Sequence, residues 1–70
     1  MDLKTIQKML ARHPFEPFKV KLSDGTTYDV SNPGLVVPLR TKILIAFPAD
    51  DRYAVCSLLH VAAIEVLAAA

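Results

Sequence analysis

The amino-acid sequence predicts a small, mainly β domain of the α+β class, in which one N-terminal helix precedes five or six short antiparallel strands. Three observations support this prediction. Apolar residues recur at helical spacing only near the start of the chain, alternating apolar and polar residues follow, and turn-forming residues divide the remainder into short segments. A chain of 70 residues is expected to form one domain over 1–70.

The helix is expected over about residues 2–12. Asp2 is a favourable N-cap residue, and its carboxylate suits the positive end of a helix. Pro14 disfavours helical backbone at the residue before it, so the helix should end near His13. The apolar residues of this segment share one face at helical spacing: Leu3, Ile6, Met9 and Leu10.

A β-hairpin is predicted next, with strands over about 18–23 and 26–30. Asp24 and Gly25 form a strong turn signal between them. A two-residue loop would turn the apolar residues of the second strand to the polar face, whereas a three-residue loop over 23–25 brings all the large apolar residues to one face. We therefore expect a structural turn, with Gly25 in the left-handed conformation and closing a G1 bulge.

Four further strands are predicted, with a short helical turn before the last one: about 35–37, 42–47, 53–58 and 63–67. The strand at 42–47 is apolar on both faces and should be central, and residues 68–70 are expected to form a frayed tail. Such a strongly bent meander either closes into a small SH3-like or Sm-like barrel or remains an open sheet with the helix on one face. The order of elements matches that of Sm-like barrels, but a fold does not determine a function.

The composition indicates more apolar side chains than the core can hide. Hydrophobic residues make up 53% of the chain and the mean hydropathy is +0.36, which excludes disorder. A domain of this length buries only roughly 60% of the surface of its unfolded chain. We therefore expect an apolar surface that a partner covers, and another copy of the chain is one candidate.

The net charge and the cysteine content bear on the expected cellular location and on the expected binding partners. The formal net charge of +1 provides no overall attraction to nucleic acid or to a membrane, and Cys56, the single cysteine, forms no internal disulfide. The first residues lack the apolar core of a signal peptide, and the apolar run over 61–70 is broken by Glu65 and too short to span a bilayer. A cytoplasmic location is expected.

The search for catalytic residues finds no recognisable constellation. Cys56 lies within a predicted strand and His60 follows four residues later, whereas a catalytic thiol needs an accessible, electropositive site. One cysteine and two histidines give no zinc-binding spacing, and two glycines leave no phosphate-binding loop. A Cys/His enzyme is therefore the least favoured hypothesis, and no cofactor or metal is expected.

Two binding hypotheses follow. The leading one is a non-enzymatic protein-interaction or self-assembling domain. Its self-association face would lie on the sheet opposite the core and comprise Leu44, Ala46, Ala54 and Cys56. The alternative is an Sm-like or SH3-like module that binds nucleic acid through basic residues of the helix and the first strand. These residues are Lys4, Lys8, Arg12, Lys19 and Lys21.

The segment over 13–30, HPFEPFKVKLSDGTTYDV, resembles a family of small uncharacterised bacterial proteins that are abundant in planctomycetes and other environmental bacteria. Their pattern is roughly Arg-Pro-Phe-x-Pro-Phe, an alternating strand, Leu-x-Asp-Gly, a His-Pro-Glu turn, and a closing Ile-x-x-Ile strand comparable to 61–66 here. This chain differs at His13, where the family has Arg, and at 32–34, where Asn-Pro-Gly replaces His-Pro-Glu. The resemblance covers most of the chain and implies the same fold, but it implies no activity.

Overall fold

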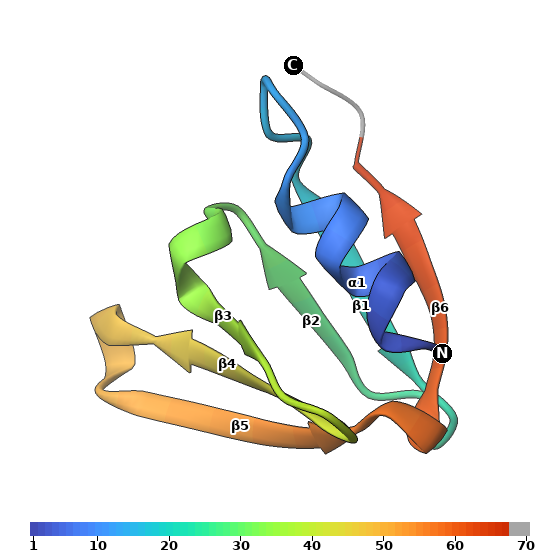
Figure 1. Cartoon of the computed structure of the whole chain (residues 1–70). Coiled ribbons are helices and arrows are strands. Elements are labelled where there is room, and N and C mark those ends of the chain that lie inside the picture. The colour runs from blue at the N-terminus through green and yellow to red at the C-terminus, as the bar shows by residue number, and fades with distance from the viewer. Residues whose placement is uncertain (68–70) are drawn as a thin grey trace.

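The computed structural model describes residues 1–67, over which the chain forms one helix and six antiparallel strands in two three-stranded sheets (Figure 1). The helix is α1 (Leu3–Leu10). The strands are β1 (Phe18–Leu22), β2 (Thr27–Val30), β3 (Val36–Pro38), β4 (Lys42–Phe47), β5 (Arg52–Ser57) and β6 (Val61–Val66). The predicted α+β class is confirmed.

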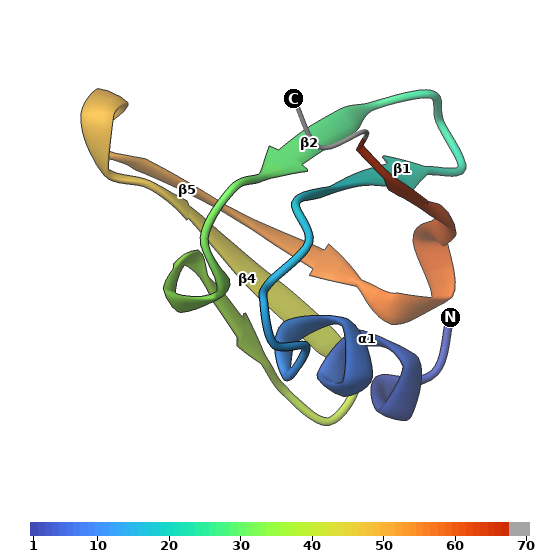
Figure 2. The same cartoon turned by 90° about the horizontal axis from the view of Figure 1, so that it is seen from above.

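The strands are ordered β2-β1-β6 in the first sheet and β3-β4-β5 in the second. The chain crosses from one sheet to the other through the 3-10 turns η1 (Pro33–Leu35) and η3 (Leu58–His60). In Figure 1 the two sheets meet at an angle. Figure 2, the view from above, shows α1 on the side where the two sheets diverge. The described strands form two sheets and no closed barrel, so the barrel prediction is not confirmed.

The core fills the space that the two sheets and α1 enclose. Each of the three contributes fully buried side chains, such as Ile6 from α1, Phe18 from β1 and Ile43 from β4. Burying a side chain of this size stabilises the fold by roughly 1.5–3 kcal/mol. The remaining buried hydrophobic residues are Met9, Val20, Val30, Val36, Ile45, Cys56, Leu58 and Val61.

The helix begins as predicted and ends earlier. Asp2 is the N-cap, and its carboxylate accepts a 2.9 Å hydrogen bond from the backbone N–H of Thr5. At the other end the backbone N–H of Ala11 donates to the carbonyl of Gln7, and this is the C-cap. The last residues before Pro14 leave the helix because a proline supplies no N–H to extend it and restricts the residue before it.

The first hairpin has the predicted three-residue loop. The backbone N–H of Leu22 donates to the Thr26 carbonyl at 2.8 Å, and that of Gly25 donates back to the Leu22 carbonyl at 3.0 Å. Gly25 has a φ of +91°, and the Asp24 carboxylate accepts from the Thr26 N–H at 2.9 Å. The structural roles predicted for Asp24 and Gly25 are therefore confirmed.

The later strands agree with the prediction in order, with shifts at their ends. The central position predicted for 42–47 is confirmed, because β4 pairs with both β3 and β5. The last strand begins at Val61 rather than at residue 63, because η3 is short and the Val61 side chain enters the core. The tail predicted over 68–70 lies outside the described residues.

Gly25→Ala is expected to destabilise the protein through the backbone alone. A Cβ at this position would meet no atom within 4 Å, so the cost is that of placing an L-residue at positive φ, about 1 kcal/mol. In a domain of this size that lowers Tm by roughly 4–8 °C in a thermal melt. Gly25→Asn should lower Tm by less than Gly25→Ala, because asparagine tolerates positive φ better than alanine does. Equal losses in the two variants would contradict this explanation.

Candidate functional site

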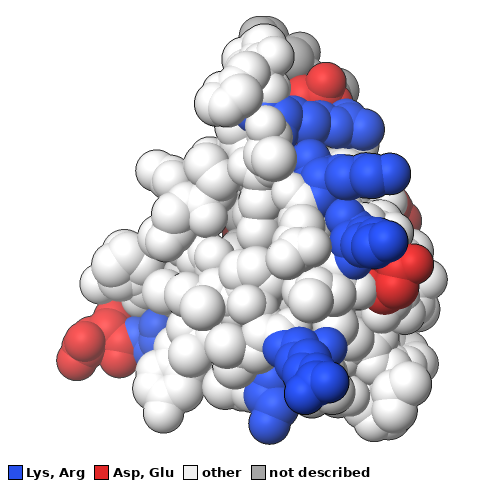
Figure 3. Space-filling model, in the orientation of Figure 1, with Lys and Arg blue, Asp and Glu red and all other residues white. Residues whose placement is uncertain are grey.

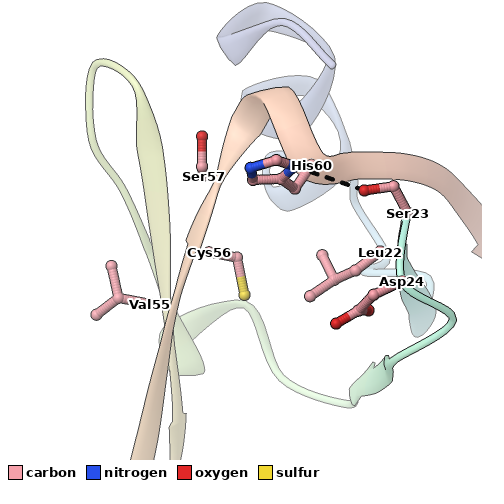
Figure 4. A pocket seen from close by; sticks show the side chains of 7 residues that line it. All are labelled: Leu22, Ser23, Asp24, Val55, Cys56, Ser57 and His60. Atoms are coloured by element: carbon pink, nitrogen blue, oxygen red, sulfur yellow. Dashed lines mark hydrogen bonds between the residues drawn. The ribbon is translucent and has the colours of Figure 1, made fainter.

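A pocket of about 440 Å³ lies where the first hairpin, β5 and η3 meet (Figure 4). A 2.8 Å hydrogen bond from the Ser23 backbone N–H to the His60 carbonyl fastens the hairpin to η3 beside it. The pocket brings together the two residues of the Cys/His hypothesis. Its lining residues are Leu22, Ser23, Asp24, Val55, Cys56, Ser57 and His60.

The chemistry of this pocket does not favour a thiol nucleophile. Cys56 is only 5% exposed, and burial raises the pKa of its thiol, with a further contribution from the negative charge of Asp24. A thiol with a raised pKa is mostly protonated at neutral pH and therefore reacts slowly. The only side-chain hydrogen-bond contact of His60 in the part of the chain that the structure describes is a 3.5 Å contact between Nδ1 and the Ser23 hydroxyl (Figure 4).

Asp24 is occupied by the turn that it stabilises. The hydrogen bond from the Thr26 backbone N–H lowers the pKa of the Asp24 carboxyl, and the Thr26 hydroxyl lowers it further. The carboxylate is thus ionised and held at the hairpin, where it has a structural role. Within residues 1–67, no group of three or more His, Cys, Asp or Glu side chains is arranged to hold a metal ion.

The self-association face predicted from the sequence is wrong for its two β5 residues. Cys56 pairs with Ile43, so its side chain points into the core. Ala54 lies two residues away on the same strand, faces the same side and packs against the core. The prediction assigned the wrong face to this strand, because both sets of alternate residues in β5 are mainly apolar. The other two predicted residues, Leu44 and Ala46, are half-buried on the solvent side of β4.

The solvent side of the second sheet carries a continuous apolar surface, which we call the apolar outer face. Val37, Leu44 and Val55 are register partners and form one row across the three strands. In the next row Ala46 is opposite Tyr53, whose side chain is 71% exposed. Val37 and Val55 are 49% and 53% exposed. The apolar outer face thus consists of Val37, Leu44, Ala46, Tyr53 and Val55.

Three of these residues were missed by sequence reasoning, although one signal could have identified two of them. Ser57 is the only polar residue among the alternating partners of the strand at 53–58, and it belongs to the same set as Tyr53 and Val55. A polar residue in one of two alternating sets indicates the solvent side. No comparable signal marks Val37, which lies in a three-residue strand.

The predicted basic residues divide between two surfaces. Those of the helix form a column over α1, which Figure 3 shows on the face toward the viewer. Arg12, at the end of this column, forms an ion pair with Glu16 at 2.9 Å. Lys4 and Lys8 are exposed and form no ion pair within the described part of the chain.

The lysines of β1 lie on the outer face of the first sheet, where acidic residues flank them. Lys19 is the register partner of Asp29 on β2 and of Glu65 on β6. The ammonium of Lys21 lies 3.4 Å from the Glu65 carboxylate. Acidic residues thus border both β1 lysines, one of them in an ion pair, and these lysines lie on a different surface from the column over α1.

Comparisons of the chain with protein-family models, with curated proteins and with solved structures gave no match. The resemblance to the planctomycete-type proteins therefore stays a prediction. In residues 1–67 the structure contains no helix that has both the length and the apolar character to cross a membrane.

The Cys56 thiol should be inert in the folded protein and reactive when the protein unfolds. Its burial and raised pKa both slow attack on a thiol reagent. Labelling with a chromogenic disulfide, with and without denaturant, measures this directly because the chain has no other cysteine. If the native protein were labelled as fast as a small free thiol, Cys56 would not be inert, and the Cys/His hypothesis would again be supported.

Proposed function

We propose that the protein is a non-enzymatic protein-interaction domain that docks another protein chain on the apolar outer face of the second sheet. The observation that supports it is the unbroken row of Val37, Leu44 and Val55 across three strands, with two members about half exposed. Contiguous exposed apolar patches are typical of interaction sites in small proteins.

The distribution of charge on this face also suits a protein partner. Its five residues carry no charge, whereas Lys42 and Asp51 lie beyond its two ends. Protein interfaces commonly combine a charge-depleted centre with a polar rim, and tyrosine is among the residues that contribute most to binding. Tyr53 provides a large, exposed aromatic side chain within the apolar surface.

Two broader parts of the proposal rest on the architecture and on the thiol. The two crossings at η1 and η3 support an SH3-like or Sm-like arrangement that is bent into two sheets. The single cysteine is free and buried, which suits a reducing, cytoplasmic location. The Cys/His enzyme is set aside in this proposal because burial keeps the Cys56 thiol protonated.

A photo-crosslinking residue at Val55 is expected to capture a protein partner in the source cells, because Val55 is central to the apolar outer face. The same residue at Thr27, which is also exposed but lies on the first sheet, is the matched control. Adducts are separated by mass and identified by peptide sequencing. Equal adducts at both positions, or none at either, would contradict the proposed docking face.

Nucleic-acid binding is a second candidate, now restricted to one side of the molecule. Lys4 and Lys8 lie one helical turn apart without acidic partners, and Figure 3 shows more basic side chains on the same side near the β3–β4 turn. The turn contains Arg40, and Lys42 begins β4 two residues later. Basic groups arranged in this way can contact successive phosphates.

If this second candidate is correct, single-stranded RNA should bind at about 50 mM salt and dissociate as salt rises. Lys8→Ala should weaken binding, whereas Lys21→Ala should not, because Glu65 already neutralises Lys21. Fluorescence anisotropy across a salt series measures both effects. Absence of binding at about 50 mM salt would exclude the candidate.

A further inference from the structure

We propose that the partner on the apolar outer face is a second copy of this chain, packed face to face with its strands reversed. In this arrangement Lys42 of each copy lies against Asp51 of the other. The inference rests on the proposed function, because it names the partner for the same face.

The two ends of the face carry opposite charges. On β4, Ile43 and Ile45 enter the core, so Lys42 points to the solvent side together with Leu44. At the other end of β4 the chain turns through η2 (Pro48–Asp50), and Asp51 borders the face there. The face is therefore cationic where β4 begins. Beyond the end of β4, Arg52 also borders the face but is paired with Asp50, so Asp51 leaves that end with a net negative charge.

Neither of these two charges is satisfied within the copy. In the part of the chain that the structure describes, Lys42 and Asp51 form no ion pair, whereas Asp50 pairs with Arg52 at 3.1 Å. Both side chains are exposed. They are thus available to a partner that presents opposite charges at the same spacing.

The charges select one of the two symmetric ways to pack the faces. A two-fold axis parallel to the strands would place each cationic end over the cationic end of the other copy, which is unfavourable. An axis across the strands reverses one copy and places Lys42 over Asp51 twice, because a two-fold interface repeats each contact. Opposite charges therefore meet at both ends of the interface.

The shape of the face fits the same arrangement. A hollow of about 330 Å³ lies over Ala46, bordered by Leu44, Pro48 and Tyr53, with the charged residues Asp51 and Arg52 at its end. Reversing one copy about an axis between the Leu44 and Ala46 rows brings each Leu44 over the Ala46 of the other copy. The larger side chain thus meets the hollow, and Val55 meets Tyr53 beside it.

The extent of the face indicates a weak dimer. Strands lie about 4.8 Å apart and rise about 3.3 Å per residue, so three strands and two rows cover only about 200 Å² per copy. Stable dimers typically bury about 800 Å² per partner. We therefore expect dissociation in the micromolar range or weaker, which requires measurement at high protein concentration.

Sedimentation equilibrium of the full chain, from about 1 μM to 1 mM, tests the dimer. We expect a monomer–dimer equilibrium that Lys42→Glu weakens at least tenfold, because this change places like charges at both ends. Lys4→Glu alters the net charge equally on the distant α1 and should leave the dimer unchanged. A monomer at every concentration would overturn the inference.

Mixing two variants tests the orientation. Lys42→Glu and Asp51→Lys should each dimerise poorly alone, and their mixture should form mixed dimers with about the affinity of the unmodified chain. Asp51 has a φ of +54°, so Asp51→Asn, which tolerates this backbone, should also weaken the dimer if Asp51→Lys fails to fold. A dimer that is insensitive to both Lys42→Glu and Asp51→Asn would overturn the antiparallel arrangement.

The crosslinking experiment at Val55 separates the two proposals. Adducts with other proteins, together with a strictly monomeric chain, would overturn the self-association inference while the docking function stands. Adducts at twice the chain mass, together with the mixed dimer, support both. Absence of adducts and of dimer would overturn both.

Discussion

The shared core between the two sheets is the constraint on which the rest of the structure depends. Each sheet buries one face, and α1 closes the open side with Ile6 at 0% exposure. Because the chain provides a single helix over its described length, no further element covers the solvent side of the second sheet. The apolar outer face is therefore a consequence of how this small core is completed, and our proposal of a docked partner rests on this exposed surface.

Local chemistry explains which parts of the fold the sequence predicts well. The Asp2 cap and the Asp24 turn depend on hydrogen bonds that reach only two or three residues along the chain. The register of the first hairpin follows from the period of two in its strands together with the loop length. Such features need no knowledge of distant residues, and the structure confirms each of them, including the positive φ of Gly25.

The parts that the sequence predicts poorly depend on pairing between distant segments. Alternation within β5 defines two faces, but both are apolar, and only the pairing of Cys56 with Ile43 decides which one is buried. The neutral surface around Lys21 depends likewise on Glu65, which lies 44 residues away in sequence. The single polar residue Ser57 is the one local signal for the first relation, and the second leaves none. The predicted self-association face and the predicted nucleic-acid surface therefore both changed when the strands were placed.

The register of β5 determines which of its residues lie in the core and which face solvent. The register that buries Cys56 raises the pKa of its thiol and removes it from any docking surface. The same register exposes Val55 and Tyr53 on the other side of the strand. The sequence placed Cys56 both in a Cys/His hypothesis and on the predicted self-association face, whereas the structure buries Cys56 and leaves its neighbours on β5 exposed. Because core and surface alternate residue by residue, the apolar outer face can be altered at Val55 without disturbing the core that Cys56 helps to fill.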